Sequence, residues 1–214
     1  MKKHLLFLTV AILATGLSAQ NETEVVTGEG YVNDVYYSLE NGTIDTADRE
    51  NWDLGFIIEK FSVSILANNG SGVECYTWAA GDTADWETLD TTGMTWKPIY
   101  NSLETFDEGA FTMNATGHPD YGWGEYHMAP ASVAHHIIGD SLYVIKTVDG
   151  AYKKLWIMEK NAPENIWEFR YANLDGTDEQ TRTIDADDYA TVNFVYYSLD
   201  THEILQRDPP TAEW

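Results

Sequence analysis

Four of the six histidines of this chain lie between residues 118 and 136, and a methionine directly follows one of them. Imidazole nitrogen and thioether sulfur are axial ligands of haem iron, and flat apolar side chains cover the porphyrin in such sites. The segment therefore predicts a haem pocket, and no metal other than the haem iron is predicted. The ligand candidates are His118, His127, Met128, His135 and His136, and the wall candidates are Tyr121, Trp123 and Tyr126.

The adjacent pair His135 and His136 limits how many of these ligands act together. Successive side chains of a strand point to opposite faces, so on a strand at most one of these two rings can reach a given ligand. The alternative interpretation is that the histidines lie at the surface, or hydrogen bond within the protein, and bind no ligand.

Several short motifs that position catalytic groups in large enzyme classes are missing from the chain. It has no GxSxG nucleophile elbow, no HExxH metal motif, no glycine-rich phosphate loop and no dinucleotide-binding fingerprint. This pattern favours a binding module without enzymatic activity.

Apolar and polar residues alternate in several short stretches, which is typical of β-strands. Trp167, Phe169 and Tyr171 alternate with charged residues in this way. The other predicted strands cover residues 52–58, 61–65, 142–148 and 152–158. The last two flank Asp149-Gly150, a dipeptide typical of tight hairpin turns. The sequence predicts a mainly β domain with long irregular loops, of which residues 67–130 hold the longest.

The N-terminus has the layout of a cleavable secretory signal peptide, residues 1–19. Two lysines precede an apolar stretch over residues 5–17, and the predicted cleavage lies between Ala19 and Gln20. The apolar stretch is shorter than the roughly 18 residues that a membrane span requires. We therefore expect an exported protein, secreted or at the cell surface, without a membrane span.

The chain is strongly acidic, with 35 Asp and Glu residues, 12 Lys and Arg residues and a formal net charge of −23. Such a surface repels phosphate backbones, which argues against nucleic acid as a partner. Cys75 is the only cysteine, so no intrachain disulfide can form. We expect Cys75 to be a small buried hydrophobic residue.

The pentapeptide VYYSL occurs twice, at residues 35–39 and 195–199. Each copy is followed by acidic, turn-rich sequence that leads to a tryptophan, and self-similarity of this kind is typical of repeated domains. We therefore expect residues 20–192 to form one domain. Residues 193–214 are then the poorly packed start of a second, truncated copy, with further domains beyond Trp214.

Four short motifs follow one another in a fairly specific order. They are NWDLGF at residues 51–56, GWGEY at residues 122–126, LYVIKTVDGAYKKLWI at residues 142–157 and WEFRY at residues 167–171. The first resembles a WDLAF-type opening strand, the third a YVIRTADGKYYKLQI hairpin and the last an ITFRY strand. Over roughly residues 31–189, the chain thus resembles the HmuY-like family, the secreted haem-binding proteins of Bacteroidetes.

This resemblance implies a one-domain, mainly antiparallel β fold that holds haem between His or Met side chains near the edge of the sheet. The chain departs from the best-studied members because it has no lipid-attachment cysteine and repeats a pentapeptide. Tandem forms of this kind look like proteins exported by type IX secretion. The predicted function is a secreted or surface-attached, non-enzymatic module that binds haem or a similar small flat ligand. The alternative is a structural, adhesive or carbohydrate-binding module of a multidomain surface protein, without a haem ligand.

Overall fold

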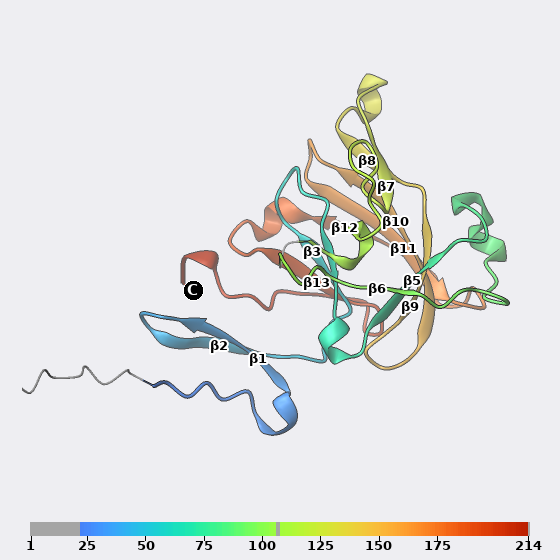
Figure 1. Cartoon of the computed structure of the whole chain (residues 1–214). Helices are drawn as coiled ribbons and strands as arrows, with labels where there is room; N and C mark the ends of the chain where they lie inside the picture. Colours follow the sequence, from blue (N-terminus) through green and yellow to red (C-terminus); the bar gives the residue numbers. More distant parts are fainter. Residues whose placement is uncertain (1–21, 106–107, 214) are drawn as a thin grey trace, which may run out of the picture.

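The computed structural model describes residues 22–105 and 108–213, and this part of the chain consists mainly of β-strands (Figure 1). The strands form three sheets, in which the paired strands are antiparallel. The prediction of a mainly β fold with long irregular loops is confirmed. The predicted signal peptide lies outside the described residues.

The largest sheet has eight strands. Its path runs β12-β11-β10-β9-β5-β6, and β8 pairs with both β10 and β7. The bounds are β5 (Glu74–Trp78), β6 (Pro98–Ile99), β7 (Gly124–His127), β8 (His136–Gly139), β9 (Leu142–Lys146), β10 (Tyr152–Asn161), β11 (Ile166–Asn173) and β12 (Gln180–Asp185).

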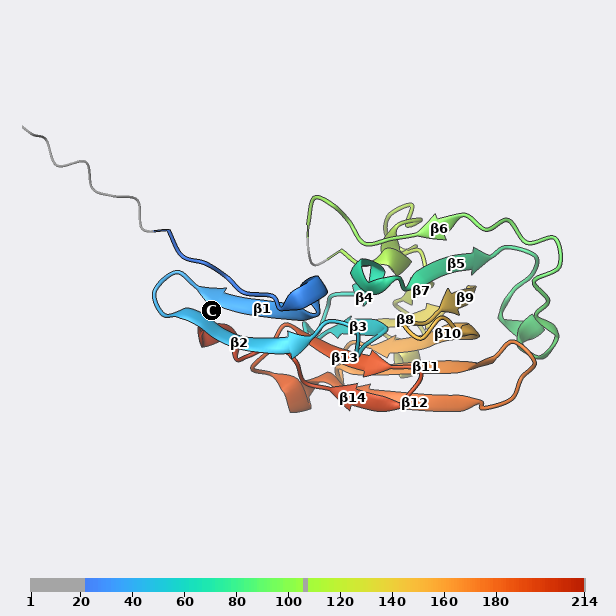
Figure 2. The ribbon, with the colours of Figure 1, turned by 90° about the horizontal axis from the view of Figure 1, so that it is seen from below.

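A four-stranded sheet of order β14-β13-β3-β4 packs against the larger sheet, and a separate β1–β2 hairpin extends to one side of both (Figure 2). These strands are β1 (Asn33–Ser38), β2 (Gly42–Asp48), β3 (Leu54–Ile57), β4 (Ile65–Ala67), β13 (Phe194–Ser198) and β14 (Glu203–Leu205). Short 3-10 helices complete the described chain. They are η1 (Glu29–Tyr31), η2 (Asn69–Ser71), η3 (Thr83–Thr88), η4 (Ala110–Thr112), η5 (Ala131–Val133), η6 (Ala186–Tyr189) and η7 (Thr211–Glu213).

The main hydrophobic core lies between the two larger sheets. The alternating residues Trp167, Phe169 and Tyr171 of β11 are fully buried there, and Phe169 stacks on Phe56 of β3 with 4.9 Å between the ring centroids. Cys75 is also fully buried, and this burial raises the pKa of its thiol. The alternation in β11 therefore predicted its inward face correctly.

The hairpin predicted at Asp149-Gly150 joins β9 and β10. Gly150 adopts φ 85°, a conformation that glycine tolerates well. Further along β10, the register with β11 shifts between Ile157 and Glu159, and the end of β10 pairs with β8 instead of β9. Gly139 permits this close approach, because an added Cβ would lie 1.7 Å from the Ile157 carbonyl oxygen. The β7–β8 pair consequently lies at one end of the sheet (Figure 1).

The strand predicted over residues 61–65 is shorter in the structure. β4 begins at Ile65, whereas Phe61 and Val63 lie in the loop between β3 and β4. A turn closed by the hydrogen bond from Ser62 N to Glu59 O interrupts the chain there. The alternation over residues 61–65 therefore does not mark a strand, and Phe61 and Val63 are apolar residues of a loop.

Residues 193–213 belong to this domain, so the expectation that they begin a poorly packed second copy is wrong. β13 lies between β3 and β14, and all five of its residues are buried. Leu199, which ends the second VYYSL copy, is 0% exposed, whereas its counterpart Leu39 is 98% exposed. The same five residues are thus all buried in one copy and, apart from Tyr36, partly or fully exposed in the other, because the neighbouring strands differ.

The two copies of the pentapeptide meet at Asp208. The hydroxyls of Tyr36 and Tyr196, which occupy the same position in their copies, both donate to Asp208 Oδ1, at 2.7 and 2.9 Å. Next to it, Arg207 Nη2 donates to Asp34 Oδ2 at 2.9 Å. Arg207 and Asp208, near the C-terminus, therefore anchor the β1–β2 hairpin to the rest of the domain.

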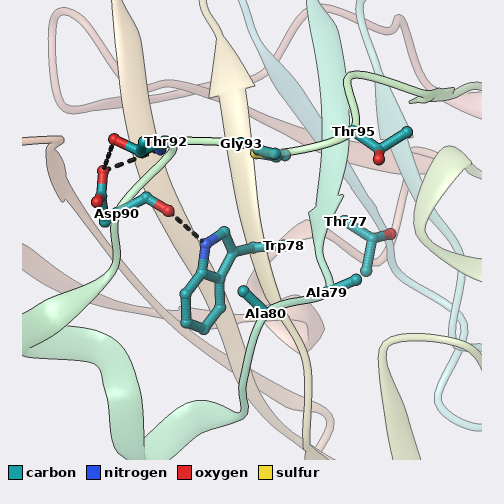
Figure 3. Close-up of a pocket in the computed structure, with 9 residues that line it drawn as sticks. Thr77, Trp78, Ala79, Ala80, Asp90, Thr92, Gly93 and Thr95 are labelled. Carbon is teal, nitrogen blue, oxygen red and sulfur yellow. Dashed lines mark hydrogen bonds between the residues drawn. The ribbon is translucent and has the colours of Figure 1, made fainter.

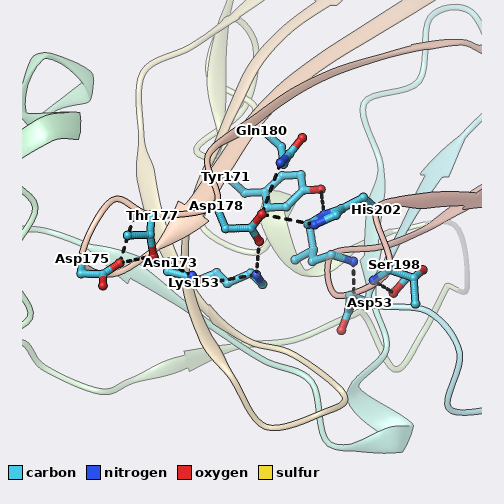
Figure 4. A network of polar contacts seen from close by, with 12 residues as sticks. Asp53, Lys153, Tyr171, Asn173, Asp175, Thr177, Asp178, Gln180, Ser198 and His202 are labelled. Atoms are coloured by element: carbon cyan, nitrogen blue, oxygen red, sulfur yellow. Dashed lines mark hydrogen bonds and ion pairs between the residues drawn. The ribbon is translucent and has the colours of Figure 1, made fainter.

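A polar network joins the turn after β13 to the large sheet (Figure 4). The Tyr171 hydroxyl lies 2.8 Å from the Tyr197 hydroxyl and 2.7 Å from His202 Nδ1. His202 Nε2 lies 3.4 Å from Asp178 Oδ1, and Lys153 Nζ donates to Asp178 Oδ2 at 3.3 Å. These contacts, like the burial of β13, integrate the C-terminal segment into the domain.

Asp53 gives this region a testable pH dependence. Its carboxylate is buried and accepts hydrogen bonds from Val148 N (2.8 Å) and Leu199 N (2.7 Å). Burial raises its pKa to about 6, although these two hydrogen bonds act to lower it. Because the folded state holds the proton more tightly than the unfolded state, the stability that this group contributes at low pH is lost as the pH rises through about 6.

We expect the free energy of unfolding to fall, relative to that of Asp53→Asn, by on the order of 2–3 kcal/mol between about pH 4 and pH 7. The asparagine does not titrate, so the difference between the two proteins isolates Asp53. Urea denaturation across this pH range measures it. A difference that does not change with pH would show that Asp53 has an ordinary pKa.

Candidate functional site

A cavity of about 340 Å³ opens beside the β7–β8 pair, in the region that the histidine spacing singles out. This volume lies in the range of small-molecule sites. Four of the predicted site residues line it, together with apolar residues from other segments. The lining residues are Phe61, Val63, His118, Tyr121, Tyr126, Met128, Ile137 and Ala162.

Asp120 holds the turn that carries His118 and Tyr121. Its Oδ2 accepts hydrogen bonds from Thr116 Oγ1 (2.6 Å) and Thr116 N (3.0 Å), and its Oδ1 accepts one from Gly122 N (2.7 Å). The hydrogen bond from the Thr116 hydroxyl has the largest effect and the one from Gly122 N the next largest, and they keep the pKa of Asp120 below its usual value. Asp-x-Gly at a turn was the available signal for this positioning residue, because an Asp side chain often bonds the backbone two residues on.

Tyr126 projects from β7 into the cavity, beside two other rings. Its ring centroid lies 5.0 Å from that of His118 and 6.5 Å from that of Tyr121. His118 Nδ1 lies 3.5 Å from the Tyr121 hydroxyl, so Nε2 is the ring atom better placed to bind a metal. Met128, which directly follows β7, is 64% exposed and lines the cavity.

The other three predicted ligands, His127, His135 and His136, do not line this cavity. His127 pairs with His136 across β7 and β8, whereas the next pair, Tyr126 and Ile137, lines the cavity. Because successive strand residues point to opposite faces, the two paired histidines point away from the cavity. His135 is exposed, and its Nδ1 hydrogen bonds with the Tyr126 hydroxyl. His135 therefore contacts a wall of the cavity and does not itself form one.

The prediction that Trp123 is a wall of the pocket is wrong for this cavity. Trp123 is 0% exposed, and its Nε1 donates to Val63 O at 3.0 Å. Its ring packs against Trp167 in the core, with 5.7 Å between centroids. The positive φ of Gly122 (88°) reverses the chain just before it. Trp123 instead supports the segment that carries Val63, which does line the cavity.

Sequence patterns did not point to four of the lining residues: Phe61, Val63, Ile137 and Ala162. Phe61 and Val63 come from the loop after β3, and Ala162 directly follows β10. These segments lie far from residues 118–128 in the sequence and meet them only through sheet topology. No local sequence pattern indicates a contact between segments so far apart.

A second cavity, of about 220 Å³, lies between the end of β5 and the loop that precedes β6 (Figure 3). Trp78 Nε1 donates to Asp90 O at 2.9 Å, and the Asp90 carboxylate accepts from Thr92 N and Oγ1. Met94 lines this cavity, but none of its lining residues is a histidine. The cavity beside β7 is therefore the better candidate for ligand chemistry that needs an imidazole.

No family model, curated protein or solved structure matches the chain. The resemblance to the HmuY-like family therefore stays a prediction that depends on the motifs. Within residues 22–105 and 108–213, the structure has no helix with the length and apolar character to cross a bilayer. In the same residues, no group of three or more His, Cys, Asp or Glu side chains is arranged to hold a metal ion.

Proposed function

We propose that the protein is a secreted or surface-attached, non-enzymatic module that binds haem, or a similar flat ligand, in the cavity beside β7. The observation that carries this proposal is the set of side chains around one opening: an imidazole, a thioether and three aromatic rings. This set fits haem, because both donor types ligate haem iron and apolar rings cover the porphyrin.

Each residue has a defined role in this proposal. His118 and Met128 are the residues that would hold the iron, which accepts nitrogen and sulfur donors when haem is bound. Phe61, Tyr121 and Tyr126 would cover the porphyrin, and the apolar area that they bury stabilises the complex by about 25 cal/mol per Å². The haem-binding family that the motifs resemble supports the same ligand class.

A carbohydrate-binding role receives less support from the exposed aromatic residues. Trp96 and Tyr152 are both partly exposed, and a coplanar pair of rings would offer a sugar a flat stacking platform. Their ring planes instead meet at 76°, and those of Trp96 and Tyr76 meet at 84°. These three rings pack edge to face, an arrangement typical of mutual packing.

Absorption spectroscopy during a haem titration tests the proposal. We expect a saturable change of the Soret band with micromolar haem and a stoichiometry of one haem per chain. Affinity should fall at acidic pH, because protonation of an imidazole removes the lone pair that binds iron. A Soret region that does not change beyond the spectrum of free haem would reject the proposal in favour of a structural or adhesive role.

A further inference from the structure

The face of the β7–β8 pair that points away from the cavity carries a second arrangement of ligand side chains. His127 and His136 stand directly opposite each other in the antiparallel register. Directly opposed residues share one face of a sheet, with their Cβ atoms about 4.5–5.5 Å apart. Two imidazoles at this separation can bind one metal ion, because metal–nitrogen bonds of about 2.0–2.1 Å bring both rings close to it.

Glu159 orients one of these two rings. Its Oε1 contacts His136 Nδ1, and both side chains are partly buried, at 29% and 14% exposure. Because Glu159 contacts Nδ1, Nε2 is the ring nitrogen of His136 that would bind a metal. A carboxylate on the second ring nitrogen is the usual companion of a metal-bound histidine, because it fixes the orientation of the ring and raises its basicity.

The charge around the pair also favours a cation. Glu125 pairs with Ile138 and lies two residues before His127, so it shares the face of the two histidines. Glu159 pairs with Ile138 from the other side and faces the same way. Two carboxylates therefore flank the two imidazoles in a protein whose formal net charge is −23.

We propose that His127 and His136 chelate one divalent transition-metal ion, for which Cu²⁺ and Zn²⁺ are the best-suited ions. Imidazole ligands suit both ions, and Cu²⁺ binds most tightly in the general order of divalent metals. The site has two protein ligands, and water completes the coordination. It does not depend on haem binding, because the haem cavity lies on the other face of the β7–β8 pair.

Isothermal titration of the untagged protein with Cu²⁺ or Zn²⁺ tests this proposal. We expect one ion per chain, and His127→Ala and His136→Ala should each weaken the binding by at least about tenfold. Glu159→Gln should weaken it about tenfold through the orientation of His136. Electron paramagnetic resonance of the Cu²⁺ complex should show two imidazole nitrogens in the unmodified protein and one in each single variant.

His118→Ala, in the haem cavity, is the matched control and should leave the metal affinity unchanged. Thermal unfolding of every variant without metal checks that the fold is intact. The absence of binding, or binding that persists in both His127→Ala and His136→Ala, would overturn the proposal. If Glu159 and His136 only form an ion pair between β10 and β8, His127→Ala should have no effect on metal binding. That result would also overturn the proposal.

Discussion

Truncation of the chain after Val192 should prevent the domain from folding. The deletion removes β13 and β14, and thus one of the two central strands of the four-stranded sheet and the edge strand beside it. Phe194, Val195, Tyr197 and Leu199 are all buried in the core, and each large apolar side chain contributes about 1.5–3 kcal/mol on burial. Their sum is comparable with the whole stability of a typical domain, about 5–15 kcal/mol.

Circular dichroism and thermal unfolding of the truncated chain measure this effect. We expect no cooperative unfolding transition. A cooperative transition close to that of the intact chain would show that residues 193–214 are dispensable, as a separate and incomplete copy would be.

The repeated pentapeptide supplies a matched pair of point variants for the same question. Leu199→Ala should lower the free energy of unfolding by about 2–5 kcal/mol, because Leu199 is fully buried. Leu39→Ala changes the same residue of the other copy, but Leu39 is exposed, so the expected effect stays within about 0.5 kcal/mol. Equal effects of the two variants would contradict the positions that the structure assigns to the two copies.

Replacement of both His118 and Met128 by alanine should weaken haem binding by at least about 100-fold. Both residues line the cavity and both are exposed, so the substitutions should remove ligands without a loss of stability. Each single variant should retain weaker binding with an altered Soret band, since one axial ligand remains. Absorption titration of the three variants measures these effects.

His127→Ala and His136→Ala are the controls for this experiment, because they also remove imidazoles from the β7–β8 region but from its other face. Their haem affinity should equal that of the unmodified protein. Loss of haem binding in these controls, together with its retention in the double variant, would move the haem site to the other face.

Alternation predicted the parts of the fold in which one strand face is buried and the other is wet. β11 is such a strand, and the Asp149-Gly150 turn correctly joined β9 to β10. The interpretation of the second VYYSL copy as the start of a repeated domain failed for a different reason. β13 is buried along its whole length because β3 and β14 flank it, and these contacts between distant segments leave no signature in five residues.

For the candidate site, the clustering of histidines pointed to a segment that lines a cavity, but it could not assign faces. His118, Tyr121, Tyr126 and Met128 do line one cavity. The strand register and the reversal of the chain at Gly122 determine which of the neighbouring residues also line the cavity. Neither feature can be inferred from residue spacing. The apolar walls contributed by other segments required the three-dimensional structure, since sheet topology brings them together.

The central claim is that side chains of this cavity bind haem iron, and a comparison of haem with iron-free protoporphyrin IX tests it most directly. The two ligands share the same flat apolar ring, so only the bonds to iron distinguish them. We predict that the unmodified protein binds haem at least about tenfold more tightly than the porphyrin, and that this difference disappears when His118 and Met128 are both alanine. Equal affinities for the two ligands in the unmodified protein would contradict ligation, and the absence of saturable binding to either would contradict the haem-binding function itself.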